Sequence, residues 1–265
     1  MTEDQIMTRQ DAGSGEPQRT RFRRGTNVIA VASGKGGVGK TWFSITLAHA
    51  LTKTGKNVLL FDGDLGLANV DVQLGLMPKR DLNDVIRGRL GLDKVIVRHE
   101  EAGFDIIAGR SGQASLSALP SQRLALLRDQ LLDVAQKYDY VIIDLGAGID
   151  RTVRMLSAAA TRTVLVTTDE PTSLTDAYAF LKLGNASGAS KHVGVVVNMT
   201  SSVTEGEKTY RTLLKASENF LRLKPPMTGM ILYDKKIRES IRAQTPILTR
   251  YPNADAAEDV YSIAQ

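Results

Sequence analysis

The chain has 265 residues with 42% hydrophobic and 24% charged side chains and a net charge of +5, as expected for a domain with a buried core and a polar surface. It contains no cysteine, which excludes disulfides, a cysteine nucleophile and cysteine-ligated iron–sulfur or metal centres. No apolar run approaches the roughly 20 residues that span a bilayer, and the polar start lacks a signal segment, so we expect a cytoplasmic protein.

Residues 1–25 lack apolar periodicity, and we expect a flexible tail there, followed by a domain over residues 26–265. Short apolar strands are predicted over residues 27–32, 58–61, 105–107, 140–143, 163–166, 193–197 and 227–231. Helices are predicted over residues 41–54, 121–137, 151–159, 173–185, 205–220 and 234–243. This alternation predicts an α/β fold with a doubly wound, mostly parallel sheet and helices on both faces. Ligands of such sheets bind at the carboxyl ends of the strands.

The first predicted strand is followed by a glycine-rich loop and then by a helix. The loop fits the pattern G-x-x-x-x-G-K-[ST] and consists of Gly34, Lys35, Gly36, Gly37, Val38, Gly39, Lys40 and Thr41. In this context its backbone N–H groups and the helix N-terminus predict a phosphate-binding site. Lys40 would reach the terminal phosphates, and the Thr41 hydroxyl would bind Mg²⁺. The alternative, a glycine-rich turn with exposed lysines, does not account for the polar residues at the following strand ends.

Carboxylates follow the predicted strands 58–61 and 140–143. Asp62 and Asp64 come one residue apart after the first of these, where a carboxylate can orient the water that attacks a phosphate. They would equally suit an acidic turn that closes a strand. Asp144 follows the second strand in the Walker B arrangement, which binds Mg²⁺ directly or through water. Asn198, after strand 193–197, could read a purine edge, although Asn is also common in turns.

Taken together, these segments resemble the signature-lysine, or deviant Walker A, ATPases, the superfamily that contains the Min and Par positioning proteins. The run KGGVGKT at residues 35–41 is the hallmark of that superfamily, and the similarity extends from residue 27 onward. Residues 64–71, 144–149 and 168–178 are most similar to the flagellar-number regulators FlhG and FleN. The resemblance implies a P-loop NTPase fold, binding of ATP or ADP with Mg²⁺, and slow ATP hydrolysis.

The resemblance also implies a role for each matching residue. Asp64 would position the hydrolytic water, with Asp62 beside it in the first switch and near the metal. Asp144 would hold the Mg²⁺ shell, Asn198 would recognise adenine, and Glu170 would lie near the nucleotide at a dimer interface. Lys35 would cross that interface to the phosphates of the partner subunit, so that ATP favours a homodimer.

Three functions remain open on the sequence. The first is a switch that controls the number or placement of flagella, with a flagellar SRP-type GTPase or transcription activator as partner. The second is a positioning ATPase acting on DNA or the division site, and the third is a biosynthetic ligase on the same scaffold. A membrane contact through the C-terminus is in doubt, because residues 254–265 are acidic and weakly amphipathic, unlike the basic helix of many relatives. The tail offers only a partial match, Asp4-Gln5-Ile6, to the motif by which relatives activate the GTPase.

Overall fold

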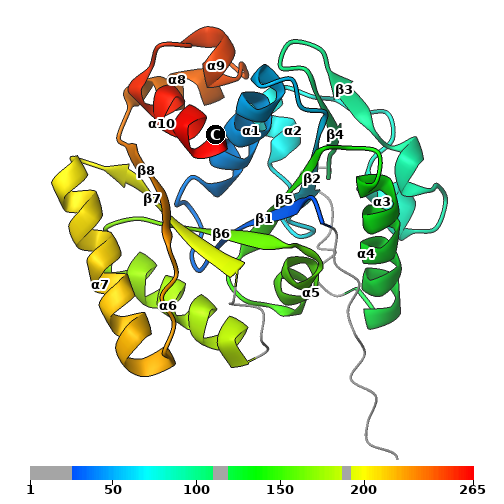
Figure 1. Ribbon diagram of the computed structural model, residues 1–265. Coiled ribbons are helices and arrows are strands. Elements are labelled where there is room, and N and C mark those ends of the chain that lie inside the picture. The colour runs from blue at the N-terminus through cyan, green and yellow to red at the C-terminus, as the bar shows by residue number, and fades with distance from the viewer. Residues whose placement is uncertain (1–25, 110–118, 187–191) are drawn as a thin grey trace, which may run out of the picture.

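The computed structural model describes residues 26–109, 119–186 and 192–265, so the predicted tail lies outside the described residues. Eight strands form one sheet in the order β3-β4-β2-β5-β1-β6-β7-β8 (Figure 1). Their bounds are β1 Val28–Ser33, β2 Val58–Gly63, β3 Val97–His99, β4 Phe104–Ile107, β5 Tyr140–Ala147, β6 Arg162–Thr167, β7 Val193–Thr200 and β8 Met227–Leu232. All neighbouring pairs are parallel except β3 and β4, which confirms the mostly parallel sheet.

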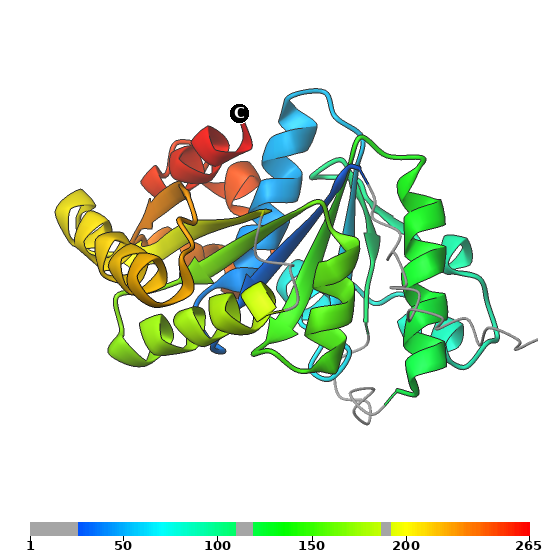
Figure 2. The same cartoon turned by 60° about the horizontal axis from the view of Figure 1, so that its bottom comes forward.

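Helices cover both faces of this sheet (Figures 1 and 2). On one face lie α1 Lys40–Lys53, α2 Val70–Leu74, α8 Lys235–Arg242, α9 Ile247–Arg250 and α10 Asp255–Ala264. On the other lie α3 Leu82–Ile86, α4 Ser121–Ala135, α5 Arg151–Ala159, α6 Pro171–Ala186 and α7 Val203–Leu221. A short 3₁₀ turn, η1 Leu92–Lys94, precedes β3.

The strands bury apolar side chains on both faces because successive residues point to opposite sides of a sheet. In β5, Val141 and Ile143 belong to the core under α4 and α5, whereas Ile142 belongs to the core under α1. Helices therefore shield both faces of the sheet from solvent, which explains the runs of Val, Ile and Leu without polar alternation in the sequence. The predicted doubly wound arrangement is confirmed.

The central strand β1 lies between β5 and β6. The connection after β1 runs through α1 to β2 on one side, and the connection after β5 runs through α5 to β6 on the other. Such a reversal of strand order opens a crevice at the carboxyl ends of the strands, where α/β proteins bind ligands. The glycine-rich loop follows β1 directly, so it lies at this crevice.

Several elements differ from the sequence prediction. Three strands extend further than predicted, so that Asp62, Asp144 and Asn198 lie inside β2, β5 and β7 rather than in the turns after them. Backbone pairing continues through Asp62 and Asp144, which lie opposite each other. Strand β3 and the short helices α2, α3 and α9 were missed, because three to five residues are too few to show a periodicity.

The C-terminal segment forms a helix that belongs to the core. Ala254, Ala256, Ala257 and Val260 are completely buried, and they pack with the residues of α1 and β8. The small alanine side chains allow a close approach of α10 to its neighbours. Among the described residues, no helix combines the length and the hydrophobicity needed to cross a bilayer.

Candidate functional site

The glycine-rich loop runs from the end of β1 to the first turn of α1. Gly39 occupies the N-cap position of α1 with φ +86°, a left-handed conformation that glycine adopts without strain. Among the described residues, no side chain caps this helix, and its first turn holds no acidic residue. The N–H groups at the start of α1 are therefore available to an anion, and the helix dipole favours negative charge there.

Three donors from α1 converge on the carboxylate of Asp144. Lys40 Nζ lies 3.1 Å from Asp144 Oδ1, and the Thr41 hydroxyl donates to Asp144 Oδ2 at 2.7 Å. Ser44 Oγ lies 3.0 Å from Asp144 Oδ1, one turn further along the helix. Lys40 and Asp144 are both buried, so each charge is compensated mainly by the other.

The donor set fits the predicted ligand. Thr41 and Asp144 place hydroxyl and carboxylate oxygens, the ligand types preferred by Mg²⁺, within hydrogen-bonding distance of each other. Lys40 adds a cation at the start of a helix that no described side chain caps, which suits a phosphate. The predicted residues Lys40, Thr41 and Asp144 are thus brought together at one point.

Asp62 lies beside Asp144 in the neighbouring strand. Its Oδ2 accepts hydrogen bonds from the backbone N–H groups of Asn69 and Val70, each at 3.2 Å. Burial and then the charge of Asp144 raise the pKa of Asp62 to about 8. Two buried carboxylates held side by side repel each other, and a divalent cation would relieve that repulsion. Asp62 therefore also fits a position near a metal ion.

Asp64 lies in the turn after β2 and faces the end of β5. Its Oδ1 accepts the N–H groups of Gly66 at 3.3 Å and Leu67 at 2.9 Å, which fixes the turn. A Cβ at Gly146 would lie 3.5 Å from the Asp64 carboxylate, so the two predicted switch segments are in direct contact. Asp64 is only partly buried and remains accessible to water.

Lys35 contacts the beginning of α6 in the same chain. Its ammonium forms an ion pair with Glu170 and donates to the Thr172 hydroxyl at 2.9 Å. The Lys35 side chain is partly exposed and that of Glu170 largely exposed, with 37% and 61% of their surface accessible. The loop itself is held against this helix, since a Cβ at Gly34 would lie 2.3 Å from the backbone of Asp176.

Asn198 supports the glycine-rich loop from β7. Its Nδ2 donates to the backbone carbonyl of Val38 at 2.8 Å, and its Oδ1 accepts the N–H of Met199 at 2.9 Å. The side chain is completely buried, and a Cβ at Gly39 would lie 2.4 Å from Nδ2. In this arrangement the amide holds the loop, and recognition of a purine by Asn198 stays a prediction.

Comparisons with known proteins agree with this geometry. The ParA family model, described as NUBPL iron-transfer P-loop NTPase, matches residues 24–265. The chain belongs to the ParA and MinD family of P-loop NTPases. It is 40% identical to the antiactivator FleN of Pseudomonas aeruginosa over 238 residues, which cover 90% of this chain and 85% of FleN. It is 33% identical to the flagellum site-determining protein YlxH of Helicobacter pylori, with 90% and 81% of the two chains covered.

Solved structures of the family share the fold. MinD in the MinC:MinD cell division complex of Aquifex aeolicus superimposes with a TM-score of 0.71 at 27% identity, covering 90% of this chain and 94% of that one. MinD of Pyrococcus horikoshii, solved with Mg-ADP, gives the same TM-score at 24% identity and 90% and 94% coverage. ParA and MinD proteins are ATPases, so an ATPase fold is assigned to this chain.

The sequence did not single out several residues of this family site. Ser44 donates a hydrogen bond to Asp144, and Thr172 accepts one from Lys35. Serine and threonine in the first turns of helices are too common to signal a site. Tyr233 follows β8 and is half exposed, and its N–H bonds to Thr200 near Asn198. An aromatic ring at the carboxyl end of a strand would suit stacking on a nucleotide base.

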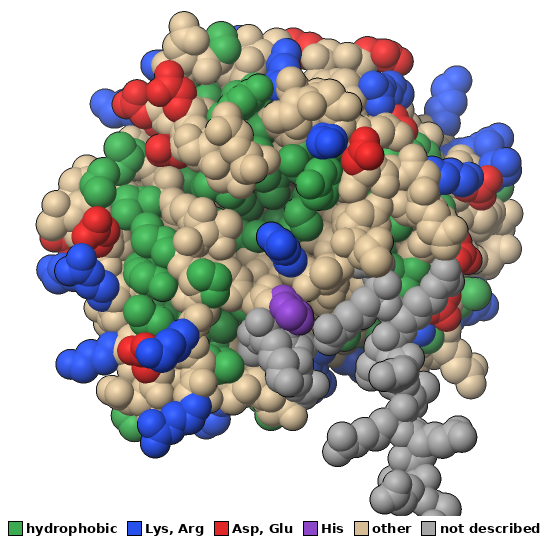
Figure 3. Space-filling view, viewed as in Figure 1, with side chains coloured by type: hydrophobic (Ala, Val, Ile, Leu, Met, Phe, Trp, Pro, Cys, Tyr) green, Lys and Arg blue, Asp and Glu red, His purple; other side chains and the backbone are tan. Residues whose placement is uncertain are grey.

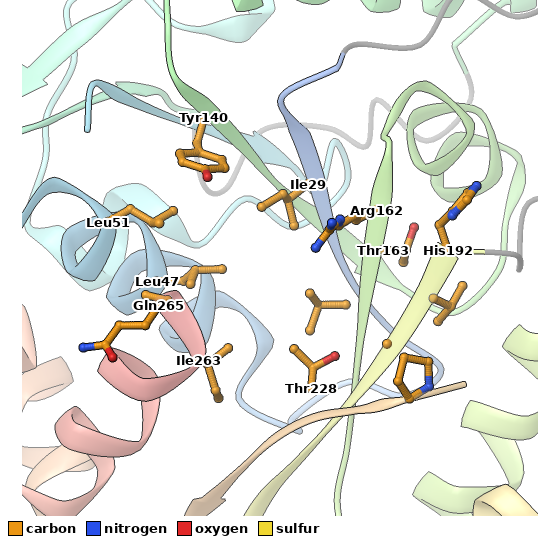
Figure 4. Close-up of a pocket in the computed structure, with 15 residues that line it drawn as sticks. Ile29, Leu47, Leu51, Tyr140, Arg162, Thr163, His192, Thr228, Ile263 and Gln265 are labelled. Carbon is orange, nitrogen blue, oxygen red and sulfur yellow. The ribbon is translucent and has the colours of Figure 1, made fainter. Parts of the chain in front are cut away.

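A cavity of about 460 Å³ lies at the amino ends of the strands, whereas the P-loop lies at their carboxyl ends. It is lined from the amino ends of β1, β6 and β7 and from α1 and α10, including Ile29, Arg162, Val193, Leu47 and Ile263 (Figure 4). On the side of the molecule shown in Figure 3, which is the side seen in Figure 1, hydrophobic side chains gather near the middle. None of the proposed nucleotide-site residues lines the cavity, so it is separate from the family site.

Proposed function

We propose that this protein is a molecular switch that binds ATP, hydrolyses it slowly and dimerises in the ATP state to regulate the number or placement of flagella. The observation that carries the proposal is the convergence of Lys40, Thr41 and Asp144 behind a loop that also holds Lys35. The flagellar part rests on 40% identity to FleN and 33% to the flagellum site-determining YlxH.

In this proposal the loop residues and Lys40 bind the phosphates, while Thr41, Asp144 and Asp62 hold the Mg²⁺. The ion would supply positive charge to the phosphate oxygens during transfer. Asp64, next to Gly146, orients the attacking water. Its position in a turn fixed by the N–H groups of Gly66 and Leu67 supports this role, because a preorganised carboxylate loses little freedom when water binds.

Lys35 would reach the nucleotide of a partner subunit. It can do so only after leaving Glu170 and Thr172, its partners within one chain. Because the ion pair is exposed, it is worth at most about 1 kcal/mol, and phosphates carrying several charges would outcompete it. Dimerisation would thus depend on the γ-phosphate, and hydrolysis would release the dimer.

Sedimentation velocity with a non-hydrolysable ATP analogue tests the proposal. Wild-type protein and a control Lys56→Ala variant, altered at an exposed lysine outside the site, should dimerise with the analogue and remain monomeric with ADP. Lys35→Ala should remain monomeric with both nucleotides. Normal dimerisation of Lys35→Ala would reject the switch in this form.

A MinD- or ParA-like role in division or DNA partition is the second candidate, supported by the fold shared with MinD at 27% identity. Its DNA version requires binding that weakens steeply with salt in the ATP state. A pull-down with an Asp64→Ala variant distinguishes the two roles. Recovery of a flagellar SRP-type GTPase or transcription activator supports the flagellar role, and recovery of division or partition proteins supports the second.

Two other activities have less support. A biosynthetic ligase would need a pocket for a substrate carboxylate beside the P-loop, and stimulation of ATP hydrolysis by small carboxylic acids would reveal it. The family description names iron transfer; a role in carrying iron–sulfur clusters would require thiolate ligands, and this sequence contains no cysteine.

A further inference from the structure

Exposed apolar side chains concentrate in the segment that follows the first switch. Leu67, Val72 and Met77 are 75%, 49% and 95% exposed, and they are three of the eight large hydrophobic residues exposed in the described part of the chain. Two of them flank helix α2, which has only five residues. Apolar side chains grouped in this way mark an interaction site more often than isolated ones do.

Helix α2 packs against the turn after α8. Gln244 Nε2 donates to the backbone carbonyl of Val72 at 2.9 Å. A Cβ at Gly75 would lie 2.9 Å from Gln244 Oε1, and Gly75 also has a positive φ of 63°. Val72 therefore lies in the same surface region as the C-terminal end of α8. We call the region formed by Val72, Met77, Arg238, Arg242 and Gln244 the α2–α8 surface.

The outer side of α8 is strongly basic. Ile237 and Ser240 face the core, whereas Arg238 and Arg242, one turn apart, are exposed. Lys79, Arg80, Lys235 and Lys236 are also exposed near these elements in the sequence. None of these six cations forms an ion pair with a described carboxylate.

The nearby acidic groups offset only part of this charge, and none of them forms an ion pair with the six cations. Asp81 caps α3, and Asp234 accepts the N–H of Lys236 at the start of α8. Glu239 accepts a hydrogen bond from the Tyr251 hydroxyl. The surface thus combines two exposed aliphatic side chains with a rim of net positive charge.

We propose that the α2–α8 surface binds an acidic amphipathic helix of a protein partner. The apolar face of such a helix would cover Val72 and Met77, and its carboxylates would pair with Arg238 and Arg242. Met77 is unbranched and adapts to different apolar partners. A lipid surface fits less well, since interfacial segments insert a long apolar face, often with Trp or Phe, and α8 exposes only polar side chains.

The surface is connected to the nucleotide site through one residue. Asp62, beside Asp144, accepts the N–H groups of Asn69 and Val70 at the start of α2. A change of charge around Asp62 therefore acts directly on the helix that carries Val72. This coupling rests on the proposed ATP switch, whereas the surface itself does not.

Fluorescence anisotropy with a labelled 18-residue peptide of Leu and Glu at helical amphipathic spacing tests the proposal. The comparison peptide has the same composition in an order without an apolar face. The amphipathic peptide should bind wild-type protein at least tenfold more tightly than the Arg238→Glu/Arg242→Glu variant or Met77→Ser. The control Lys208→Glu/Lys215→Glu, with the same charge change on exposed residues of α7, should bind like wild type.

Equal binding of both peptides, or equal loss in the α7 control, would overturn the proposal as nonspecific charge attraction. Loss of binding to anionic phosphatidylglycerol vesicles in the α8 variant, with peptide binding unchanged, would assign the surface to a membrane instead. Tighter peptide binding with the ATP analogue than with ADP supports the coupling through Asp62, and equal binding overturns it. Failure to dimerise with ATP would reject the proposed switch while the peptide result still decides the surface.

Discussion

Asp62 and Asp144 occupy paired positions in the parallel strands β2 and β5, so two carboxylates are buried side by side at the carboxyl end of the sheet. They are stabilised differently. Asp144 accepts hydrogen bonds from the side chains of Lys40, Thr41 and Ser44. Among the described residues, Asp62 accepts hydrogen bonds only from backbone N–H groups. Without a ligand, the repulsion between the two carboxylates is relieved by a proton, which Asp62 keeps up to about pH 8.

The raised pKa of Asp62 predicts an unusual pH dependence. The folded state keeps a proton up to about pH 8, whereas the unfolded chain releases it near pH 4. Without nucleotide or Mg²⁺, this residue makes the protein less stable as pH rises from about 4 to 8. Asp62→Asn removes that contribution, so its gain in urea midpoint over wild type should grow between pH 5 and 8. A constant difference across this range would contradict the assignment.

Asp144 compensates a buried lysine. Asp144→Ala leaves the Lys40 ammonium buried without its partner and should lower the free energy of unfolding by about 3–5 kcal/mol. Urea denaturation without nucleotide measures this effect. Glu207→Ala, which removes an exposed ion pair with Arg211, should change stability by less than about 1 kcal/mol. Equal effects of the two substitutions would argue against a buried charge pair.

Gly39 combines a left-handed backbone with a close neighbour. Gly39→Ala forces a Cβ to within 2.4 Å of Asn198 Nδ2, in addition to a conformational penalty of about 1 kcal/mol. We expect the Asn198–Val38 hydrogen bond to break and nucleotide binding to be lost, measured by calorimetric titration with ADP. Gly55→Ala has a similar φ of 80° but no atom within 4 Å, so it should show the conformational penalty alone and bind ADP normally.

His49 predicts a second pH effect, in the opposite direction. Burial, followed by the charges of Lys53 and His99, lowers the pKa of His49 to about 4, and neither ring nitrogen has a hydrogen-bond partner among the described residues. In the unfolded chain His49 is protonated below about pH 6.5, whereas in the folded state it is protonated only below about pH 4. The free energy of unfolding therefore falls as the pH is lowered through this interval. His49→Leu should lose less stability than wild type between pH 6.5 and 4.5 in urea titrations. His192→Leu, at an exposed position, should follow wild type.

The sequence predicted the sheet, its main helices and the residues around Asp144 because these depend on local patterns. Buried parallel strands produce continuous apolar runs, and the glycine loop has a spacing that few other structures require. The partners of Lys35 could not be derived in this way. Glu170 is 135 residues away from Lys35 along the chain. Glu170 and Thr172 contact Lys35 only because β6 pairs with β1 in the sheet.

The strand ends were the least accurate part of the prediction. Asp and Asn favour turns, so their appearance suggested that the strands stop before Asp62, Asp144 and Asn198. Here the pairing of Asp62 with Asp144, the hydrogen bond that Asn198 donates to the glycine loop and those that Asp62 accepts at the start of α2 outweigh that preference. The polar residues are consequently held by the sheet, which makes their positions more rigid than a turn would.

The contact between Gly34 and Asp176 links the phosphate loop mechanically to the body of α6. With no side chain between them, a rotation of α6 of even a few degrees must displace the loop backbone, since close-packed interiors transmit strain. A protein that pressed on α6 could therefore advance or retard nucleotide release without touching the nucleotide. The helix would serve as an external lever on the timing of the cycle.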